Sequence, residues 1–265
     1  MVWQRHKLSD AGSWSGWLRA GGQWLLNAMV PPRCPLCRAP VLEPHTLCPA
    51  CWPRLHLIDE PACPASGLPL IGTPQAIAAY KSLPALLERA PWRALLAAAF
   101  HDDAARELVH RLKYHDDHTT ARLMAQLMWR RLRAARPPAH MLIVPVPLHR
   151  RRLWARRFNQ SAILARHLAR LARLPHDPLM LARVRPTAPQ TGLSGQARRR
   201  NLKDAFAVPP ARRTALKGRH VLLVDDVFTT GATVRACADA LRKAGAAEVW
   251  VAVFALAGSR RALHI

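Results

Sequence analysis

This chain of 265 residues has no apolar run of about 18 or more residues, the length that a membrane-spanning helix requires. Its N-terminus also lacks the continuous apolar core of a secretory signal peptide. Hydrophobic residues make up 50% of the chain, a share typical of a globular protein, and the length allows one sizeable core with a small satellite. We therefore expect a cytoplasmic protein without a transmembrane segment.

Acidic residues are scarce. The chain has 16 of them against 40 basic residues, which gives a net charge of +24, and only six of the basic residues are lysines. A surplus of this size attracts polyanions such as nucleic acid or anionic lipid, whatever the specific function. Because arginine bias with abundant alanine can also reflect coding composition, the charge supports a polyanionic partner without proving one.

Tyrosine and phenylalanine are few, whereas tryptophan is concentrated near the start of the chain. Trp3, Trp14, Trp17 and Trp24 all lie in the extension over residues 1–30. One interpretation is an amphipathic helix that lies on a partner or peripherally on the inner face of the membrane. The other is a segment that caps the domain. Gly16, Gly21 and Gly22 weaken the helix, so we favour the cap.

Cysteines are few but regularly placed. Cys34 with Cys37, and Cys48 with Cys51, form two C-x-x-C pairs with ten residues between them. Four thiolates at this spacing can close a tetrahedral structural zinc site, and the metal would supply most of the folding energy of a small module over 31–72. The alternative is two disulfides in an oxidising compartment. The lack of a signal peptide favours zinc.

The most informative stretch runs from Val221 to Thr233, where four apolar residues lead into two adjacent carboxylates. The short β-rich run 220–224 predicts a strand that is buried on both faces of a parallel sheet. Ligands bind beyond the carboxyl ends of such strands, which is where we expect Asp225 and Asp226.

A turn follows the acidic pair and opens a helix. Its residues are Thr229, Thr230, Gly231, Ala232 and Thr233. Unsatisfied backbone N–H groups and the helix dipole favour a phosphate there, Gly231 lets the backbone approach closely, and the threonines add donors. Carboxylates beside a phosphate site suit a ligand with sugar hydroxyls, Mg²⁺ and a phosphate. The alternative is a strand that ends in solvated aspartates and an ordinary helix cap.

Strand and helix patterns alternate through residues 73–265, which we expect to form the main domain. Strands are expected at 95–100, 142–146, 179–183, 204–208, 220–224 and 249–254. Helices are expected at 103–113, 119–135, 160–173 and 232–244, and the proline pairs 137–138 and 209–210 are expected in loops. This alternation predicts an α/β fold with a mostly parallel sheet and helices on both faces.

The stretch 221–233 resembles the phosphoribosyl pyrophosphate (PRPP) signature of type I phosphoribosyltransferases. With the cysteine pairs, the resemblance sharpens to the ComF family, which joins an N-terminal cysteine-knuckle module to a phosphoribosyltransferase domain, and it covers nearly the whole chain from Cys34 onward. It implies that Asp225 and Asp226 act at the catalytic centre by holding the ribose hydroxyls. It also implies that residues 229–233 bind the 5′-phosphate and that Mg²⁺ accompanies PRPP.

The chain departs from this family where further cysteine pairs often lie. Cys63 is followed by Ser66 instead of a second cysteine, and Leu83 and Leu86 stand where the last pair would lie. The resemblance therefore predicts that a second metal site has been lost and that one remains.

Lys113 lies near the end of a segment similar to the family's helix that ends in Leu-Lys-Tyr. The resemblance makes it a candidate contact for the pyrophosphate group. A surface lysine with a buried stem is the alternative.

An arginine cluster follows the expected strand 142–146. Its members are Arg150, Arg151, Arg152, Arg156 and Arg157. Guanidinium groups bind phosphate bidentately, so the cluster can face PRPP or a nucleic-acid backbone, with a solvated basic face as the alternative. Arg157 stands in the glycine position of the family's Arg-Gly-Phe-Asn-Gln pattern.

The polar segment 185–202 has little apolar periodicity and predicts a functional lid. It resembles the flexible hood that closes over PRPP in type I transferases. By that resemblance Arg198, Arg199 and Arg200 neutralise the departing pyrophosphate.

Three functions fit these patterns. The first is a phosphoribosyltransferase that displaces pyrophosphate from PRPP with an acceptor the sequence does not identify. The second is a module, without turnover and regulated by PRPP, that handles single-stranded DNA, because family members are linked to competence. The third is a zinc-knuckle adaptor that docks a competence helicase or a membrane channel.

Overall fold

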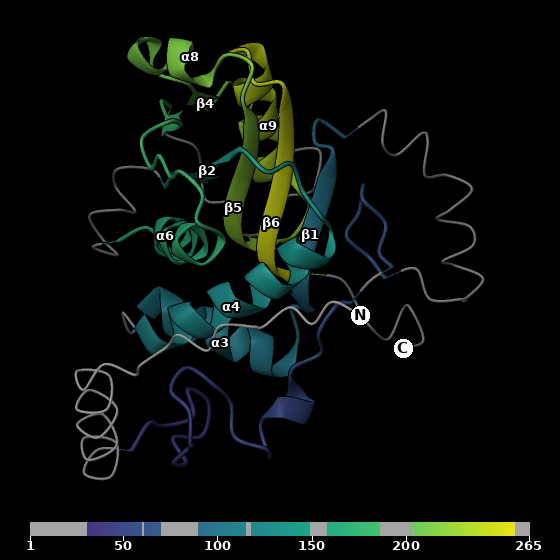
Figure 1. Cartoon of the computed structure of the whole chain (residues 1–265), viewed down its shortest axis with the longest axis vertical. Coiled ribbons are helices and arrows are strands. Elements are labelled where there is room, and N and C mark those ends of the chain that lie inside the picture. The colour runs from purple at the N-terminus through teal and green to yellow at the C-terminus, as the bar shows by residue number, and fades with distance from the viewer. Residues whose placement is uncertain are drawn as a thin grey trace, which may run out of the picture.

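Four parallel strands form the central sheet of the computed structural model, in the order β1-β6-β5-β2 (Figure 1). The structure describes residues 31–59, 61–69, 90–114, 118–148, 158–185, 202 and 204–257. The strands are β1 (Ala94–Phe100), β2 (Met141–Pro145), β5 (His220–Phe228) and β6 (Glu248–Leu256). The apolar run that opens β5 is buried on both faces, as its composition predicts.

The described part of the chain contains six helices. They are η1 (Trp52–Arg54), α3 (Asp103–Tyr114), α4 (His118–Ala134), α6 (Gln160–Ala172), α8 (Pro210–Leu216) and α9 (Ala232–Lys243). The four longest begin and end close to the positions predicted from apolar periodicity. No helix among the described residues is both long and apolar enough to cross a bilayer.

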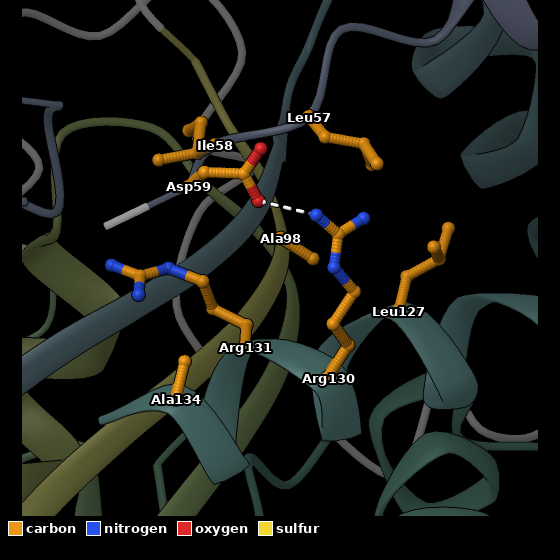
Figure 2. A pocket seen from close by; sticks show the side chains of 8 residues that line it. All are labelled: Leu57, Ile58, Asp59, Ala98, Leu127, Arg130, Arg131 and Ala134. Atoms are coloured by element: carbon orange, nitrogen blue, oxygen red, sulfur yellow. Dashed lines mark hydrogen bonds and ion pairs between the residues drawn. The ribbon is translucent and has the colours of Figure 1, made fainter. Parts of the chain in front are cut away.

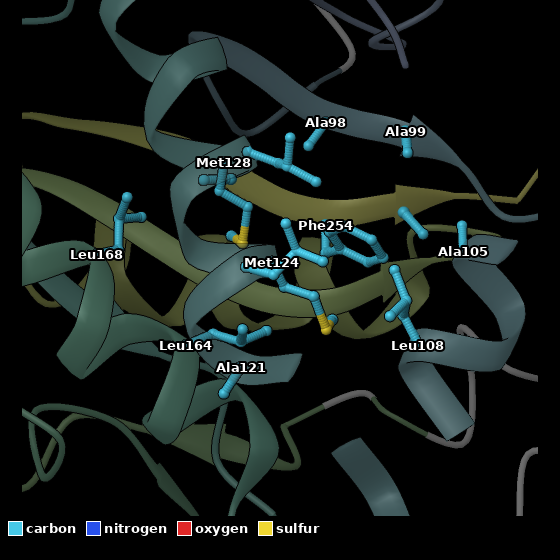
Figure 3. Close-up of a cluster of buried hydrophobic side chains, with 14 of the residues drawn as sticks. Ala98, Ala99, Ala105, Leu108, Ala121, Met124, Met128, Leu164, Leu168 and Phe254 are labelled. Carbon is cyan, nitrogen blue, oxygen red and sulfur yellow. The ribbon is translucent and has the colours of Figure 1, made fainter. Parts of the chain in front are cut away.

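Side chains alternate between the two faces of the sheet. On one face, Leu222 and Val224 of β5 pack with α3, α4 and α6. Figure 3 shows this core, where methionines of α4 and leucines of α6 surround Phe254 of β6. On the other face, Val221 and Leu223 pack with α9 and with the segments around β4 and α8. The α/β architecture with helices on both faces is therefore confirmed.

Two expected strands do not join the parallel sheet. β3 (Ala182–Arg183) and β4 (Phe206–Ala207) pair antiparallel with each other in a separate ribbon. At the free edge of β2, the segment after α6 forms only a single parallel bridge, between Ile143 and His176. The contact stays this short because Pro175 has no N–H to donate and because Asp177 turns the chain by accepting from the Leu179 N–H at 2.9 Å.

The proline pair 209–210 was expected in a loop, and this is wrong for Pro210, which begins α8. The first residues of a helix need no intrahelical N–H bond, and the fixed φ of proline suits that position. The other pair, Pro137 and Pro138, lies in an irregular connection, as predicted.

The cysteine module packs directly on the main fold. Cys34, Leu36 and Cys48 belong to the same buried cluster as α3 and α4. The Arg111 side chain of α3 also donates to the Leu36 carbonyl at 2.8 Å. In Figure 1 the purple module lies beside α3. The module therefore contacts a helix that also reaches the candidate site.

Candidate functional site

The acidic pair lies where the sheet narrows. β2 ends at Pro145, opposite Val224, whereas β5 continues along β6 alone as far as Phe228. The sequence predicted that Asp225 and Asp226 follow the strand, but they lie within β5. They nevertheless come directly beyond the carboxyl end of β2, at the open edge where ligands bind in parallel sheets.

Asp225 is held by two donors. Its Oδ1 accepts from the Ser161 hydroxyl of α6 at 2.8 Å and from the Asp226 N–H at 2.9 Å. Burial of the carboxyl group and the adjacent Asp226 charge raise the pKa of Asp225 to about 7, although these hydrogen bonds and the Lys113 charge act in the opposite direction. Asp225 can therefore change protonation near neutral pH.

Asp226 has a cationic partner. Its Oδ2 lies 2.8 Å from the Lys113 ammonium at the end of α3, and its side chain is 13% exposed. Its Oδ1 accepts from the Val227 N–H at 2.8 Å. The structure thus brings Lys113 to the acidic pair, a contact between residues far apart in the sequence.

The turn after β5 is shaped for a close backbone approach. Gly231 has φ 70°, in the left-handed region, and a Cβ there would lie 2.4 Å from the Phe228 ring. Thr229 and Thr230 are exposed, and Gly231 has no side chain to cap the first N–H groups of α9. N–H groups of this kind, at the positive end of a helix, are able to bind an anion.

The side chains of Phe228, Trp92 and Arg235 pack against one another beside this turn. The Phe228 ring meets Trp92 edge-on with centroids 5.9 Å apart, and the Arg235 guanidinium lies 5.3 Å from the Trp92 centroid. The Trp92 indole N–H donates to the Ala65 carbonyl at 3.1 Å. The conformation of the turn therefore depends on Trp92, which precedes the first strand in the sequence.

Sequence reasoning missed two residues of this site. Ser161 is the second residue of α6, and its N–H is capped by the Asn159 side chain at 3.1 Å. His101 follows β1, and burial, with the charges of Lys113 and Arg106, lowers its pKa. Only the cap motif at Asn159 was a usable signal, because nothing local in the sequence relates either residue to the acidic pair.

The four cysteines of the two pairs form one cluster. All four sulfurs lie within 4.8 Å of one another, and Cys37 Sγ is 3.4 Å from Cys48 Sγ. Zinc bonded to four thiolates at about 2.3 Å keeps the sulfurs about 3.8 Å apart, so the cluster fits that ion. All four thiols are free, and no disulfide links them.

The thiols of this cluster differ in their acidity. Burial opposes ionisation of Cys34, but the backbone N–H groups of Cys48, Cys37 and Leu36 outweigh it and lower the pKa of Cys34 to about 7. Burial and hydrogen bonds with the other thiols raise the pKa of Cys51 to about 12. The four sulfurs therefore cannot all ionise without a cation to compensate their charge.

The turn at Cys63 repeats the backbone hydrogen bonds of the turn at Cys34 but has only one of its two cysteines. The Cys34 N–H donates to Ala39 at 2.8 Å and the Arg38 N–H to Cys34 at 2.9 Å; likewise the Cys63 N–H donates to Leu68 at 2.8 Å and the Gly67 N–H to Cys63 at 2.7 Å. Ser66 occupies the place of the second ligand. The turn survives because Gly67 adopts φ 71° without strain and Cys63 is buried.

Several predicted residues lie outside the described part of the chain. They are Leu83, Leu86, Arg150, Arg151, Arg152, Arg156, Arg157, Arg198, Arg199 and Arg200.

Comparison with known proteins matches both parts of this architecture. The double zinc ribbon domain matches residues 25–82, and the phosphoribosyl transferase domain matches residues 159–264. The DNA utilization protein YhgH of Escherichia coli K12 is 36% identical over 230 residues, which cover 84% of this chain and 96% of that protein. The chain belongs to the ComF family.

Other ComF relatives carry related names. Competence protein F of Haemophilus influenzae is 33% identical over 171 residues, covering 63% of this chain and 74% of that protein. Competence protein ComFC of Bacillus subtilis is 24% identical over 220 residues, covering 78% of this chain and 82% of that protein. In this ComF chain the zinc ribbon match and the clustered thiols together support a structural zinc site.

Proposed function

We propose that this chain binds Mg²⁺–PRPP at the carboxyl edge of β5 and transfers its phosphoribosyl group during the handling of internalised single-stranded DNA. One observation carries the proposal. Two carboxylates, Asp225 and Asp226, lie where β2 has ended, shortly before a glycine turn that opens α9. A ligand with ribose hydroxyls and a 5′-phosphate matches this order of groups along the chain.

Each group has a role in this proposal. Asp225 and Asp226 accept hydrogen bonds from the ribose hydroxyls, and the turn 229–233 anchors the 5′-phosphate, so that binding far from C1 orients the sugar. Lys113 exchanges its contact with Asp226 for the negatively charged pyrophosphate. Mg²⁺ prefers oxygen ligands such as these carboxylates and, when bound with PRPP, neutralises part of the pyrophosphate charge.

The reaction breaks the bond between C1 and the pyrophosphate oxygen, and the leaving group takes the bonding pair. An acceptor nucleophile forms the new bond to C1 and releases its proton. Positive charge develops on the ribose as pyrophosphate departs, and an ionised acidic pair stabilises that charge electrostatically. Because the pKa of Asp225 is raised to about 7, this stabilisation is stronger at a slightly alkaline pH.

The link to DNA is supported by the names of the relatives and by the charge of the chain. Proteins named for DNA utilization and competence are its relatives, and its net charge of +24 suits a polyanion. In this proposal the chain works in the cytoplasm on strands that have crossed the membrane, alone or with a competence helicase or channel.

A calorimetric titration with PRPP and Mg²⁺ tests the site. The wild type should bind, and the Asp225→Asn/Asp226→Asn variant should lose at least tenfold in affinity while remaining folded by circular dichroism. Equal affinity in the two proteins would remove the acidic pair from the proposal. Release of pyrophosphate in the presence of candidate acceptors then separates an enzyme from a protein that only senses PRPP.

A further inference from the structure

The C-terminal half of α4 carries a basic hollow with a tryptophan in it. The hollow measures about 540 Å³ and is lined by Gln126, Trp129, Arg130, Arg133, Ala134 and Arg136. Most of these residues recur at a spacing of three or four, so they share one face of the helix. We refer to this set of six residues as the α4 hollow.

Positive charge dominates the α4 hollow. Three of its six residues are arginines, and none carries a carboxylate. Among the described residues, neither Arg133 nor Arg136 pairs with an acid, and both are exposed. Arginines in the last turn of a helix also suit its dipole, but that role requires neither a hollow nor an aromatic ring.

Arg130 forms an ion pair on the surface. Its guanidinium donates to Asp59 at 2.7 Å, and its side chain remains 59% exposed. Figure 2 shows this pair joining α4 to the segment Leu57–Asp59, with Arg131 alongside. The Ile58 N–H in turn donates to the Ala98 carbonyl of β1 at 3.0 Å, which ties that segment to the sheet. One side of the hollow is therefore linked to β1 through this segment.

Trp129 supplies an aromatic surface. It is partly exposed while one side packs against the core, and the Arg133 guanidinium lies 5.9 Å from its ring centroid. Proteins bind single strands through such combinations, in which arginines follow the phosphates and an aromatic ring stacks on an unpaired base. A duplex keeps its bases stacked and offers no free base face to the ring.

The α4 hollow is separate from the candidate PRPP site. α4 ends at Ala134 and the chain then enters β2 at Met141, at the amino edge of the sheet. The acidic pair lies beyond the carboxyl end of β2, at the opposite edge. A strand bound in the hollow and a ligand at the acidic pair would therefore occupy different surfaces.

We infer that the α4 hollow binds single-stranded nucleic acid, with Trp129 stacking on a base and Arg130, Arg133 and Arg136 contacting phosphates. This inference rests on the DNA-handling part of the proposed function and gives it a location. It is independent of whether PRPP is turned over.

The test is a fluorescence anisotropy titration of the full chain with a labelled 20-nucleotide oligothymidine, at several salt concentrations. The variant Arg133→Gln/Arg136→Gln should lose roughly tenfold in affinity, and its salt slope should fall by about 1.4, the value for two phosphate contacts on a single strand. Trp129→Leu should lose at least about fivefold with an unchanged slope, because stacking is not ionic. Arg166→Gln/Arg170→Gln, an equal charge change on exposed positions of α6, is the matched control and should bind as the wild type does.

The outcomes separate the two proposals. If the wild type does not bind the oligonucleotide at low salt, the proposed DNA-handling function and this inference are both rejected. If the wild type binds and the α6 control loses as much as the α4 variant, the whole basic surface binds and the hollow is rejected. Binding of phosphatidylserine vesicles, but not of the oligonucleotide, that depends on Trp129 would assign the surface to a membrane instead. PRPP affinity should be unchanged in all three variants.

Discussion

At the scale of single residues, the two adjacent aspartates have different environments. Asp226 is paired with Lys113 at 2.8 Å, whereas Asp225 is enclosed beside Ser161 and its pKa is raised to about 7. The charge of Asp226 is therefore compensated by a lysine, whereas Asp225 is compensated by a proton that it releases near neutral pH.

The raised pKa makes stability depend on pH through Asp225. The folded chain keeps a proton that the unfolded chain releases above its ordinary pKa of 3.8, so the stabilisation is full below that value and is lost as the pH rises through about 7. We expect Asp225→Asn, which is always neutral, to gain stability relative to wild type by roughly 2–3 kcal/mol between pH 5 and pH 8. Urea unfolding at the two pH values measures this difference, and a pH-independent difference would contradict the expected shift.

Ser161 acts on the site through Asp225 and is a positioning residue. Its hydroxyl donates to the carboxylate and lowers the pKa of Asp225, so Ser161→Ala should raise that pKa further. We expect the pH midpoint of Mg²⁺–PRPP binding to move up by about one unit, the equivalent of a hydrogen bond to a charged group. Ser161→Thr keeps the hydroxyl and should restore the midpoint. A loss of affinity that is equal at every pH would point to a packing role only.

At the scale of elements, the turn between β5 and α9 depends on one glycine. A Cβ at Gly231 would meet the Phe228 ring at 2.4 Å, and Phe228 is backed by Trp92. Gly231→Ala should therefore displace the turn, weaken PRPP binding at least tenfold and cost about 1–3 kcal/mol of stability.

Gly218 is a matched control for this prediction. It has φ 73°, close to that of Gly231, but a Cβ there would meet nothing within 4 Å. Gly218→Ala should cost about 1 kcal/mol of backbone strain and leave PRPP affinity unchanged. Calorimetry on both variants separates the strain from the clash, and equal PRPP affinities would show that the turn does not bind the ligand.

At the scale of the whole molecule, the cysteine module and the candidate site are joined through α3. Arg111 of α3 donates to the Leu36 carbonyl in the first knuckle, and Lys113 of the same helix reaches Asp226. Arg54 of the module also pairs with Asp103 at 3.1 Å, at the start of α3. A change in the module therefore alters the support of a helix that reaches the site.

We expect one zinc ion per chain, because the turn at Cys63 has Ser66 in place of a second cysteine ligand. Removal of zinc with a chelator, or Cys48→Ser, should lower the melting temperature of the main transition, because the free energy of metal binding stabilises the folded module. It should also weaken PRPP binding several-fold, because the module supports α3. Atomic absorption and thermal melts measure both effects. Cys63→Ser is the control and should leave the zinc content at one. Unchanged PRPP affinity after zinc removal would show that α3 is held by other contacts.

Local sequence was sufficient wherever a pattern lies within one element. The apolar run before Asp225 predicted a buried parallel strand, and the periodicity of α3, α4, α6 and α9 predicted their extents, because each pattern reflects which side of the element is buried. It was insufficient for β3 and β4. Ala182 pairs with Ala207 and Arg183 with Phe206, so no local window of the sequence contains both partners.

The sequence by itself determined the cysteine cluster, the acidic pair and the glycine turn, since each is a set of residue types at a fixed short spacing. Only the tertiary structure brought Lys113 to Asp226, Ser161 to Asp225 and Trp92 beneath the turn. The α4 hollow also required it, because its wall includes Arg130 held by Asp59 from another segment. The physical reason is that spacing along the chain fixes which side chains share a face, whereas packing of whole elements decides which faces meet.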